Sequence, residues 1–286
     1  MVAQESLEIA APDGYRVYRV LGSRTGVSTL LDAMDTGTGN RVALRVYAPE
    51  LSADPGFREA FERTVEIHRT TQLPHVVRLV GSSLDRNGDG PQFVALEFVD
   101  GATLRERVDF APLTLTPTLR LAQRLAEALD AASDAGLVHR RLGSRAILLD
   151  DDDIEEPMLT DFGVGKDITD EEDGLPRSSP GRLLGEVDCI TPEEIRGAPP
   201  DARSHVYALS AIVFECLTGS PPFASDWRPA TLHAHLAEPP PKVTEGAPRV
   251  PAGVGEVLGR GMAKAPDERP PTARHLAAEL ELAAGL

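Results

Sequence analysis

Residues 137–149 read LVHRRLGSRAILL, and the tripeptide Asp161-Phe162-Gly163 follows them along the chain. Apolar residues are spread through the stretch, as in a loop that packs against a core; they are Leu137, Val138, Leu142, Ile147 and Leu148. Polar residues stand between them, including two adjacent arginines. The stretch therefore predicts a packed loop that presents a polar centre.

This loop resembles the catalytic loop of the eukaryotic-like protein kinase family, in particular its bacterial serine/threonine branch, whose pattern is H-R-D-x-K-x-x-N. His139 and Arg140 match that pattern. Arg141 stands at the aspartate, Gly143 at the lysine and Ala146 at the asparagine. Arginine accepts no proton at physiological pH. The resemblance therefore implies a pseudokinase, a domain that keeps the kinase fold but has no catalytic residue.

A glycine-rich segment resembles the family's loop over the nucleotide phosphates, where backbone N–H groups approach closely. It runs from Leu21 to Ser28, but only Gly22 matches the pattern and Gly26 is out of register. An ordinary hairpin with two glycines is the equal alternative.

The family's V-A-x-K strand stands here as residues 42–45, with Arg45 at the lysine that holds phosphates. Arginine keeps the charge but changes the geometry. The glutamate that pairs with this lysine falls at Thr64, while Glu62 and Glu66 lie on other faces of the expected helix. We expect that ion pair to be absent. Arg45 then either reaches Asp161 or faces solvent.

The resemblance also implies an apolar slot of adenine size between two lobes. The Glu97 carbonyl and the Val99 N–H would meet the adenine edge, with Leu96 as the gatekeeper. Four further residues would line the slot: Leu21, Leu30, Ala43 and Leu148. The sequence leaves open whether the slot is empty, filled by its own apolar side chains or occupied by a nucleotide. Asp161 offers one carboxylate, which makes a weak metal site at best.

Residues 191–193, Thr-Pro-Glu, resemble the family's A-P-E segment, and Arg269 stands at the position of its buried partner. We predict an ion pair from Glu193 to Arg269 that holds the large lobe together. His205 replaces a buried aspartate that normally braces the catalytic loop. This indicates either loss of the brace or a satisfied core histidine.

Residues 165–180 are acidic and rich in turn formers, and occupy the activation-loop position. We expect them to be mobile. Thr169, Ser178 and Ser179 are candidate phosphorylation sites, which would recruit a phosphothreonine-reading domain if modified in trans.

Alternating, β-branched segments precede mostly helical ones, which indicates an α+β chain with the two-lobed protein-kinase fold. We predict a tail over 1–14, a small antiparallel β lobe over 15–98 with five strands and one helix, and a larger helical lobe over 99–286. The expected strands are 15–22, 28–35, 41–47, 76–84 and 92–99, and the first helix is 57–70. Residues 35–40 and 48–49 are expected to turn. Later helices are expected at 104–108, 117–135, 192–195, 204–217, 231–237, 254–262 and 272–284, with a hairpin interrupted by the acidic run 150–153.

Composition excludes several classes of function. With 29 Lys and Arg against 45 Asp and Glu, the formal net charge of -16 argues against binding nucleic acid or an anionic membrane surface. Cys189 and Cys216 form no metal or disulfide pattern, which favours a reducing, cytoplasmic location. No secretory signal opens the chain, and residues 206–217 are too short to span a bilayer, so no direct membrane insertion is expected.

Together these features predict a catalytically inactive kinase-like domain that acts as a signalling scaffold or regulatory binding module. It would belong to the cytosolic part of a membrane-tethered parent or act alone, and analogy links it to bacterial cell-wall regulation. No cofactor is required in this interpretation; ATP, with or without Mg²⁺, is left open. Expected partners are a phosphothreonine-reading domain or an active kinase. Two alternatives are an unconventional ATP-dependent phosphotransferase that uses Arg45 and Asp161, and a nucleotide-sensing switch without chemistry.

Overall fold

The computed structural model describes residues 11–24, 27–85, 90–162, 177–179, 182–183 and 187–286. The chain divides into two compact units. The first runs to Glu62 and resumes over Arg78–Phe98, and the second comprises Arg63–Val77 and Val99–Leu286. One boundary thus falls after residue 98, whereas residues 63–77 belong with the second unit.

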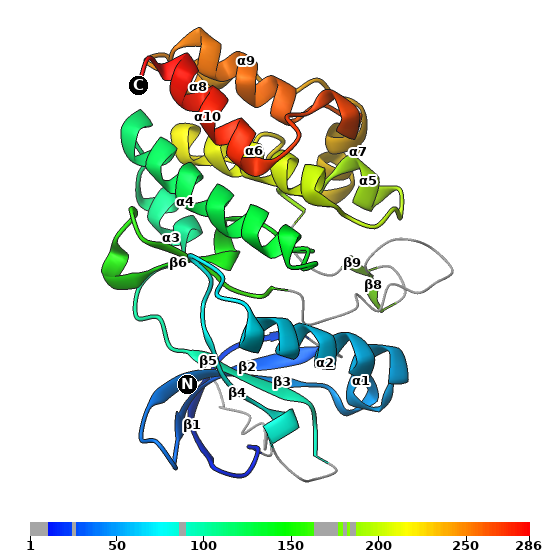
Figure 1. The fold of residues 1–286 in the computed structure, drawn as a ribbon. Helices are drawn as coiled ribbons and strands as arrows, with labels where there is room; N and C mark the ends of the chain where they lie inside the picture. Colours follow the sequence, from blue (N-terminus) through cyan, green and yellow to red (C-terminus); the bar gives the residue numbers. More distant parts are fainter. Residues whose placement is uncertain (1–10, 25–26, 86–89, 163–176, 180–181, 184–186) are drawn as a thin grey trace, which may run out of the picture. The chain divides into compact units, whose positions relative to one another are not determined.

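The first unit is built on an antiparallel sheet with the strand order β1-β2-β3-β5-β4 (Figure 1). Its strands are β1 (Tyr15–Arg24), β2 (Ser28–Asp35), β3 (Arg41–Tyr47), β4 (Leu79–Ser82) and β5 (Phe93–Glu97). Alternate side chains form one apolar face, as the two-residue period of a strand dictates. This core contains Tyr15, Leu31, Ala33, Val42, Leu44, Val46, Phe93 and Ala95.

Two helices follow β3: α1 (Pro49–Ala53) and α2 (Pro55–Thr70). Tyr47, at the end of β3, meets Phe57 and Phe61 of α2 at ring distances of 5.1 and 5.9 Å. Of residues 48–49, which we expected to turn, Ala48 lies outside any helix or strand, and the prediction is wrong at Pro49. Pro49 opens α1 instead, because proline lacks an N–H and suits the first turn of a helix, where that donor would have no intrahelical partner.

The second unit is mainly helical (Figure 1). Its longer helices are α3 (Leu104–Phe110), α4 (Leu115–Asp134), α6 (Ala202–Thr218), α7 (Arg228–Ala237), α9 (Ala252–Gly261) and α10 (Ala273–Ala284). Short elements complete it: α5 (Pro192–Ile195), α8 (Val243–Gly246), which we did not predict, and the strand pairs β6 (Ile147–Leu149) with β7 (Pro157–Leu159) and β8 (Arg177–Ser179) with β9 (Arg182–Leu183). Single 3-10 turns cover Ser83–Asp85 in the first unit and Ser144–Ala146, Asp150–Asp152 and Pro266–Glu268 in the second.

Helix α6 is the centre of the second unit and packs against α4, α8, α9 and α10. Every residue from Ser204 to Leu217 is buried, as expected of a helix that is apolar on all sides. At Gly261 of α9 an added Cβ would lie 1.9 Å from the Ser210 Oγ, so only glycine allows α9 to approach so closely. The helix predicted over 204–217 is confirmed, and no helix within the described residues has both the length and the apolarity to cross a bilayer.

Candidate functional site

Residues 137–149 follow α4 in the second unit and comprise a loop and, at their end, β6. Gly136 ends α4 with a φ of 78°, a left-handed conformation that glycine adopts without strain. Leu137, Leu142 and Ile147 are then buried in the core of this unit, while Val138 and Leu148 are half-buried. The expected packing is thus confirmed for three of the five apolar residues.

His205 of α6 holds this loop through its backbone. The His139 N–H donates to the His205 Nε2 at 2.9 Å, and the His205 Nδ1 lies 3.2 Å from the Ser133 Oγ. The predicted loss of the brace is therefore wrong, because an imidazole nitrogen accepts the bond that a carboxylate would accept. The alternative of a satisfied core histidine is confirmed.

The tripeptide begins with Asp161, whose φ of 66° is unusual for a residue other than glycine. Aspartate tolerates this region better than most residues, at a cost on the order of 1 kcal/mol. Its neighbours fix the backbone: the Thr160 N–H donates to the Ala146 carbonyl at 3.0 Å, and Phe162 is 3% exposed with its ring 4.7 Å from that of His139. The loop therefore packs against Thr160 and Phe162, the two neighbours of Asp161.

The three positions that depart from the family pattern lie in this loop. The Arg141 N–H donates to the His139 Nδ1 at 3.3 Å, and the Arg141 side chain is half-buried. Gly143 and Ala146 bring no polar side chain. The acidic residues Asp150, Asp151 and Asp153 are exposed, as is usual for a run of like charges between two strands. Within the ranges that the structure describes, no group of three or more His, Cys, Asp or Glu side chains is suited to hold a metal ion.

In the first unit, strand register places four predicted nucleotide residues on one face of the sheet. Leu30 pairs with Arg45 and Ala43 pairs with Leu96, and directly paired residues share a face. This face lies opposite the apolar core; Leu30, Ala43 and Leu96 are half-buried on it. Arg45 is only 9% exposed, and its Nη1 donates to the Ser28 Oγ at 3.2 Å. The alternative in which Arg45 faces solvent is therefore wrong.

Three of the other predicted nucleotide residues are exposed: Leu21, Gly22 and Glu97. Leu21 and Gly22 lie on β1, where an added Cβ at Gly22 would meet nothing within 4 Å. Glu97 ends β5, donates its N–H to the Arg78 carbonyl at 2.9 Å and accepts from the Arg78 side chain at 3.2 Å. Val99, the first residue of the second unit after residue 98, is half-buried. Gly26 lies outside the described residues.

An acidic residue that our sequence reasoning missed lies on the same face of the sheet. Asp32 is 2% exposed and accepts from Arg41 at 2.7 and 2.9 Å and from Arg19 at 3.1 Å. The Arg41 hydrogen bonds, opposed by burial and helped by Arg19, hold the pKa of Asp32 below its ordinary value. Arg41 also stacks on the Phe98 ring at 3.6 Å. Only the pairing of Arg19 and Ala43 with Asp32 across the strands reveals this cluster.

On α2, Thr64 is buried while Glu62 and Glu66 are exposed, which confirms that the two glutamates face other directions. The predicted absence of an ion pair to Arg45, like the suggested approach of Arg45 to Asp161, concerns both units and stays a prediction.

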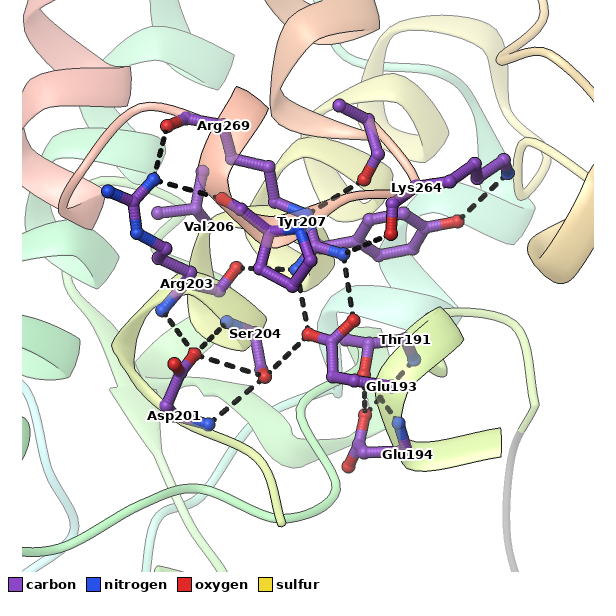
Figure 2. A network of polar contacts seen from close by, with 12 residues as sticks. Thr191, Glu193, Glu194, Asp201, Arg203, Ser204, Val206, Tyr207, Lys264 and Arg269 are labelled. Atoms are coloured by element: carbon purple, nitrogen blue, oxygen red, sulfur yellow. Dashed lines mark hydrogen bonds and ion pairs between the residues drawn. The ribbon is translucent and has the colours of Figure 1, made fainter. Parts of the chain in front are cut away.

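Figure 2 shows the network that the Thr-Pro-Glu segment forms with Arg269. The Arg269 Nη1 and Nη2 donate to the two carboxylate oxygens of Glu193 at 2.7 and 2.8 Å. The Ser204 Oγ donates to the same carboxylate at 2.7 Å. The Arg269 side chain is fully buried. The predicted ion pair is confirmed, and its bidentate form is the strongest arrangement for such a pair.

Burial alone would raise the pKa of Glu193, but the hydrogen bonds from Arg269 and Ser204 outweigh it and hold that pKa below its ordinary value. The charged form is therefore the one that the fold stabilises. Cys189 and Cys216 are both buried free thiols, so the expectation of no disulfide between them is confirmed.

The comparisons with known proteins agree with this geometry. A family model described as protein tyrosine and serine/threonine kinase matches residues 23–280. Serine/threonine-protein kinase PknH of Mycobacterium bovis is 33% identical over 92% of this chain, and PknD of Mycobacterium tuberculosis 32% over 89%. A probable serine/threonine-protein kinase PknB of Corynebacterium glutamicum is 31% identical over 94%. The chain spans 43%, 37% and 42% of the length of these three relatives.

Among solved structures, the Mycobacterium tuberculosis PknI kinase domain is 26% identical, with a TM-score of 0.72, over 96% of this chain and 97% of that one. The chain has the two-lobed protein-kinase fold and belongs to the protein kinase family. Within that family its relatives are the bacterial eukaryotic-like serine/threonine kinases.

These relatives correct our prediction of an inactive scaffold. The matching family is one of protein kinases, and the curated relatives are named serine/threonine-protein kinases, which indicates an enzyme. The physical reason is that phosphoryl transfer depends mostly on positioning and charge stabilisation, and little on covalent work by the protein. Loss of one proton acceptor at Arg141 therefore does not by itself indicate an inactive domain. The expectation that no cofactor is required is likewise unsupported, since the family points to ATP and Mg²⁺.

Proposed function

We propose that this chain is an ATP-dependent serine/threonine protein kinase domain with an unconventional catalytic loop. The observation that carries the proposal is the family match over residues 23–280, together with relatives named as serine/threonine-protein kinases. The intact loop brace and the buried Glu193–Arg269 pair support it, because a preserved framework keeps the reacting groups in place.

In this proposal, the nucleotide is bound by the residues that the family resemblance indicates. Apolar side chains enclose the adenine: Leu21, Leu30, Ala43, Leu96 and Leu148. The Glu97 carbonyl and the Val99 N–H take its edge, and Gly22 allows backbone N–H groups to approach phosphate. The Arg45 guanidinium binds phosphate oxygens, for which its planar fork is well suited.

Mg²⁺ fits the residues that are present, although with a reduced ligand set. Magnesium in such sites is held by one or two carboxylates together with substrate phosphates and water, and Asp161 supplies one carboxylate. The strained backbone of Asp161, fixed by the contacts of Thr160 and Phe162, agrees with a functional position. When bound, the ion neutralises charge on the phosphates of ATP.

The reaction needs no carboxylate at Arg141 if the transition state is loose. The oxygen of a serine or threonine hydroxyl on the substrate forms a bond to the γ-phosphorus, and the bond from that phosphorus to the β–γ bridging oxygen breaks, releasing ADP. The hydroxyl proton leaves late, to an oxygen of the transferred phosphoryl group. Arg141 offers a permanent positive charge, which stabilises negative charge on that group as arginine does in other phosphotransferases.

Partners and location follow from this chemistry. The substrates are proteins, and a second kinase or a phosphothreonine-reading domain is a partner if the activation segment is phosphorylated. Ser178 and Ser179 lie on β8, whereas Thr169 is outside the described residues. A cytoplasmic location, as the cytosolic domain of a larger parent, matches the supply of ATP and the free buried thiols of Cys189 and Cys216.

Phosphate incorporation tests the proposal. Purified protein with γ-labelled ATP, MgCl₂ and a generic protein substrate should transfer label, and Asp161→Ala should lower the rate by at least about 10²-fold, because charge stabilisation at the phosphates is lost. Asp153→Ala removes an exposed carboxylate beyond the loop and should leave the rate unchanged. Incorporation that is equal in wild type and Asp161→Ala would overturn the assignment.

A further inference from the structure

A chain of polar contacts inside the second unit joins α4, α6, the loop and Thr160, the residue directly before Asp161. It runs from Ser133 of α4 to His205 of α6, then to His139 of the loop, and ends at Arg141 and Thr160. His205 is 1% exposed and His139 is 3% exposed. Since water does not reach these rings, each ring nitrogen takes its partner from the protein.

The contacts of Ser133 fix the tautomer of His205. The Ser133 Oγ donates its only proton to the Leu129 carbonyl at 2.9 Å, so it can only accept from the His205 Nδ1, 3.2 Å away. The proton of His205 therefore sits on Nδ1. Its Nε2 is left as the acceptor for the His139 N–H at 2.9 Å.

His139 has the opposite tautomer. Its Nε2 lies 2.8 Å from the Thr160 carbonyl, which only accepts, so the Nε2 carries the proton and donates. Its Nδ1 is then the acceptor for the Arg141 N–H at 3.3 Å. Both rings are neutral in this arrangement, and neither Nε2 of His205 nor Nδ1 of His139 can take a proton without losing its bond.

We propose that His205, as a neutral ring with its proton on Nδ1, is a positioning residue that orients the catalytic loop and, through His139, the segment that carries Asp161. Ser133 selects the required tautomer, and His139 transmits the constraint to the Arg141 backbone and the Thr160 carbonyl. The expected effect on catalysis rests on the proposed kinase function, but the hydrogen-bond arrangement does not.

Burial supports this assignment. Removal from water, with a smaller contribution from His139, lowers the pKa of His205 to about 3. The ring is therefore neutral throughout the physiological range, and the brace holds without any carboxylate. A neutral acceptor also leaves no uncompensated charge in a core where the neighbouring donor is a backbone N–H.

The ring nitrogens of the wild-type protein give the first test. Nitrogen-15 chemical shifts from NMR should show the proton on Nδ1 in His205 and on Nε2 in His139, unchanged between pH 8 and pH 6. The opposite tautomer at His205, or a protonated ring at pH 6, would overturn the proposal. This measurement needs neither a variant nor enzymatic activity.

Two substitutions give the second test, since each amide reproduces one end of the imidazole. His205→Gln places its amide oxygen near the position of Nε2 and keeps an acceptor for the His139 N–H. His205→Asn reaches only the position of Nδ1 and removes that acceptor. Hydrogen exchange of the His139 amide should stay within about 3-fold of wild type for Gln and rise about 10-fold or more for Asn, as expected for loss of one buried hydrogen bond.

The kinetic constants of the two variants should differ in the same way as their hydrogen exchange. His205→Asn should lower kcat about 10-fold with the KM for ATP within about 2-fold, while His205→Gln should retain most of the activity. If His205→Asn does not fold, Ser133→Ala serves instead, and it should raise exchange at the His139 amide because Nδ1 then lacks its acceptor. Equal exchange in wild type, Gln and Asn variants, or in wild type and Ser133→Ala, would overturn the proposal. If the protein lacks kinase activity but shows the expected hydrogen exchange, the proposed kinase function is refuted and the role of His205 in orienting the loop stands.

Discussion

Two buried sets of contacts fix loops in the second unit, and they use opposite chemistry. Glu193 and Arg269 form a bidentate ion pair that ties α5 to the chain before α10. His205 and His139 are joined by a hydrogen bond from a backbone N–H to a neutral ring. The ion pair keeps the residues of the family pattern, whereas at the loop His205 replaces the aspartate of that pattern.

The difference shows which feature each site requires. An arginine that is fully buried requires a negative charge beside it, since an unpaired buried charge is costly. The loop N–H requires only an acceptor at the right point, so a neutral nitrogen suffices. Replacement of the carboxylate is therefore tolerated at the brace of the loop, and we expect it not to be tolerated at the ion pair.

The largest effect is expected when the buried ion pair between Glu193 and Arg269 is broken. Glu193→Gln leaves Arg269 buried without its countercharge and should lower the free energy of unfolding by about 3 kcal/mol. Urea unfolding followed by circular dichroism measures it. The control is Glu279→Gln, which removes an ion pair between two partly exposed side chains, Arg260 and Glu279, and should cost less than about 1 kcal/mol. Equal losses in the two variants would show that burial of the pair does not matter.

A smaller effect is expected at the neutral contact between His205 and His139, where the dependence of the unfolding free energy on pH provides the test. The pKa of His205 falls from 6.5 to about 3 in the folded protein, so the unfolded chain binds a proton there first, and stability is lost as the pH falls below 6.5. At pH 5 this loss is on the order of 2 kcal/mol. His205→Gln has no such proton site, so its unfolding free energy should decline less between pH 7 and pH 5.

His235, whose pKa burial and the nearby Lys264 also lower to about 3, provides the internal reference because its contribution is the same in both proteins. Parallel curves of unfolding free energy against pH for wild type and His205→Gln would contradict the assignment of a buried neutral ring at His205.

The smallest effect concerns the helix that carries Glu193. Thr191 caps α5, accepting from the Glu194 N–H at 3.3 Å, so Thr191→Ala should cost about 1 kcal/mol in unfolding free energy. Thr114 precedes α4 without a side-chain cap bond, and Thr114→Ala should change stability by only a few tenths of that value. A thermal or urea unfolding series compares them. A loss at Thr191 as small as at Thr114 would mean that the ion pair alone positions α5.

Sequence reasoning succeeded where the family resemblance names both partners of a contact. The Glu193–Arg269 pair joins positions 76 apart and was predicted because residues 191–193 and Arg269 match two positions of the family pattern. At His205 it left two alternatives: the satisfied core histidine is confirmed, and the loss of the brace, which the missing carboxylate suggested, is wrong. Sequence reasoning failed at Arg141, where the loss of a proton acceptor suggested an inactive domain and the relatives indicate kinases.

The sequence by itself determined the types and order of the main elements, the antiparallel sheet followed by helices, and the buried character of α6. These follow from local periodicity and from turn residues, which act over a few positions. Only the tertiary structure decided which atom accepts the His139 N–H, that Arg45 is buried beside Ser28, and that Asp32 lies between two arginines. Each of these depends on groups far apart in the chain that folding brings within about 3 Å, the range in which a hydrogen bond forms.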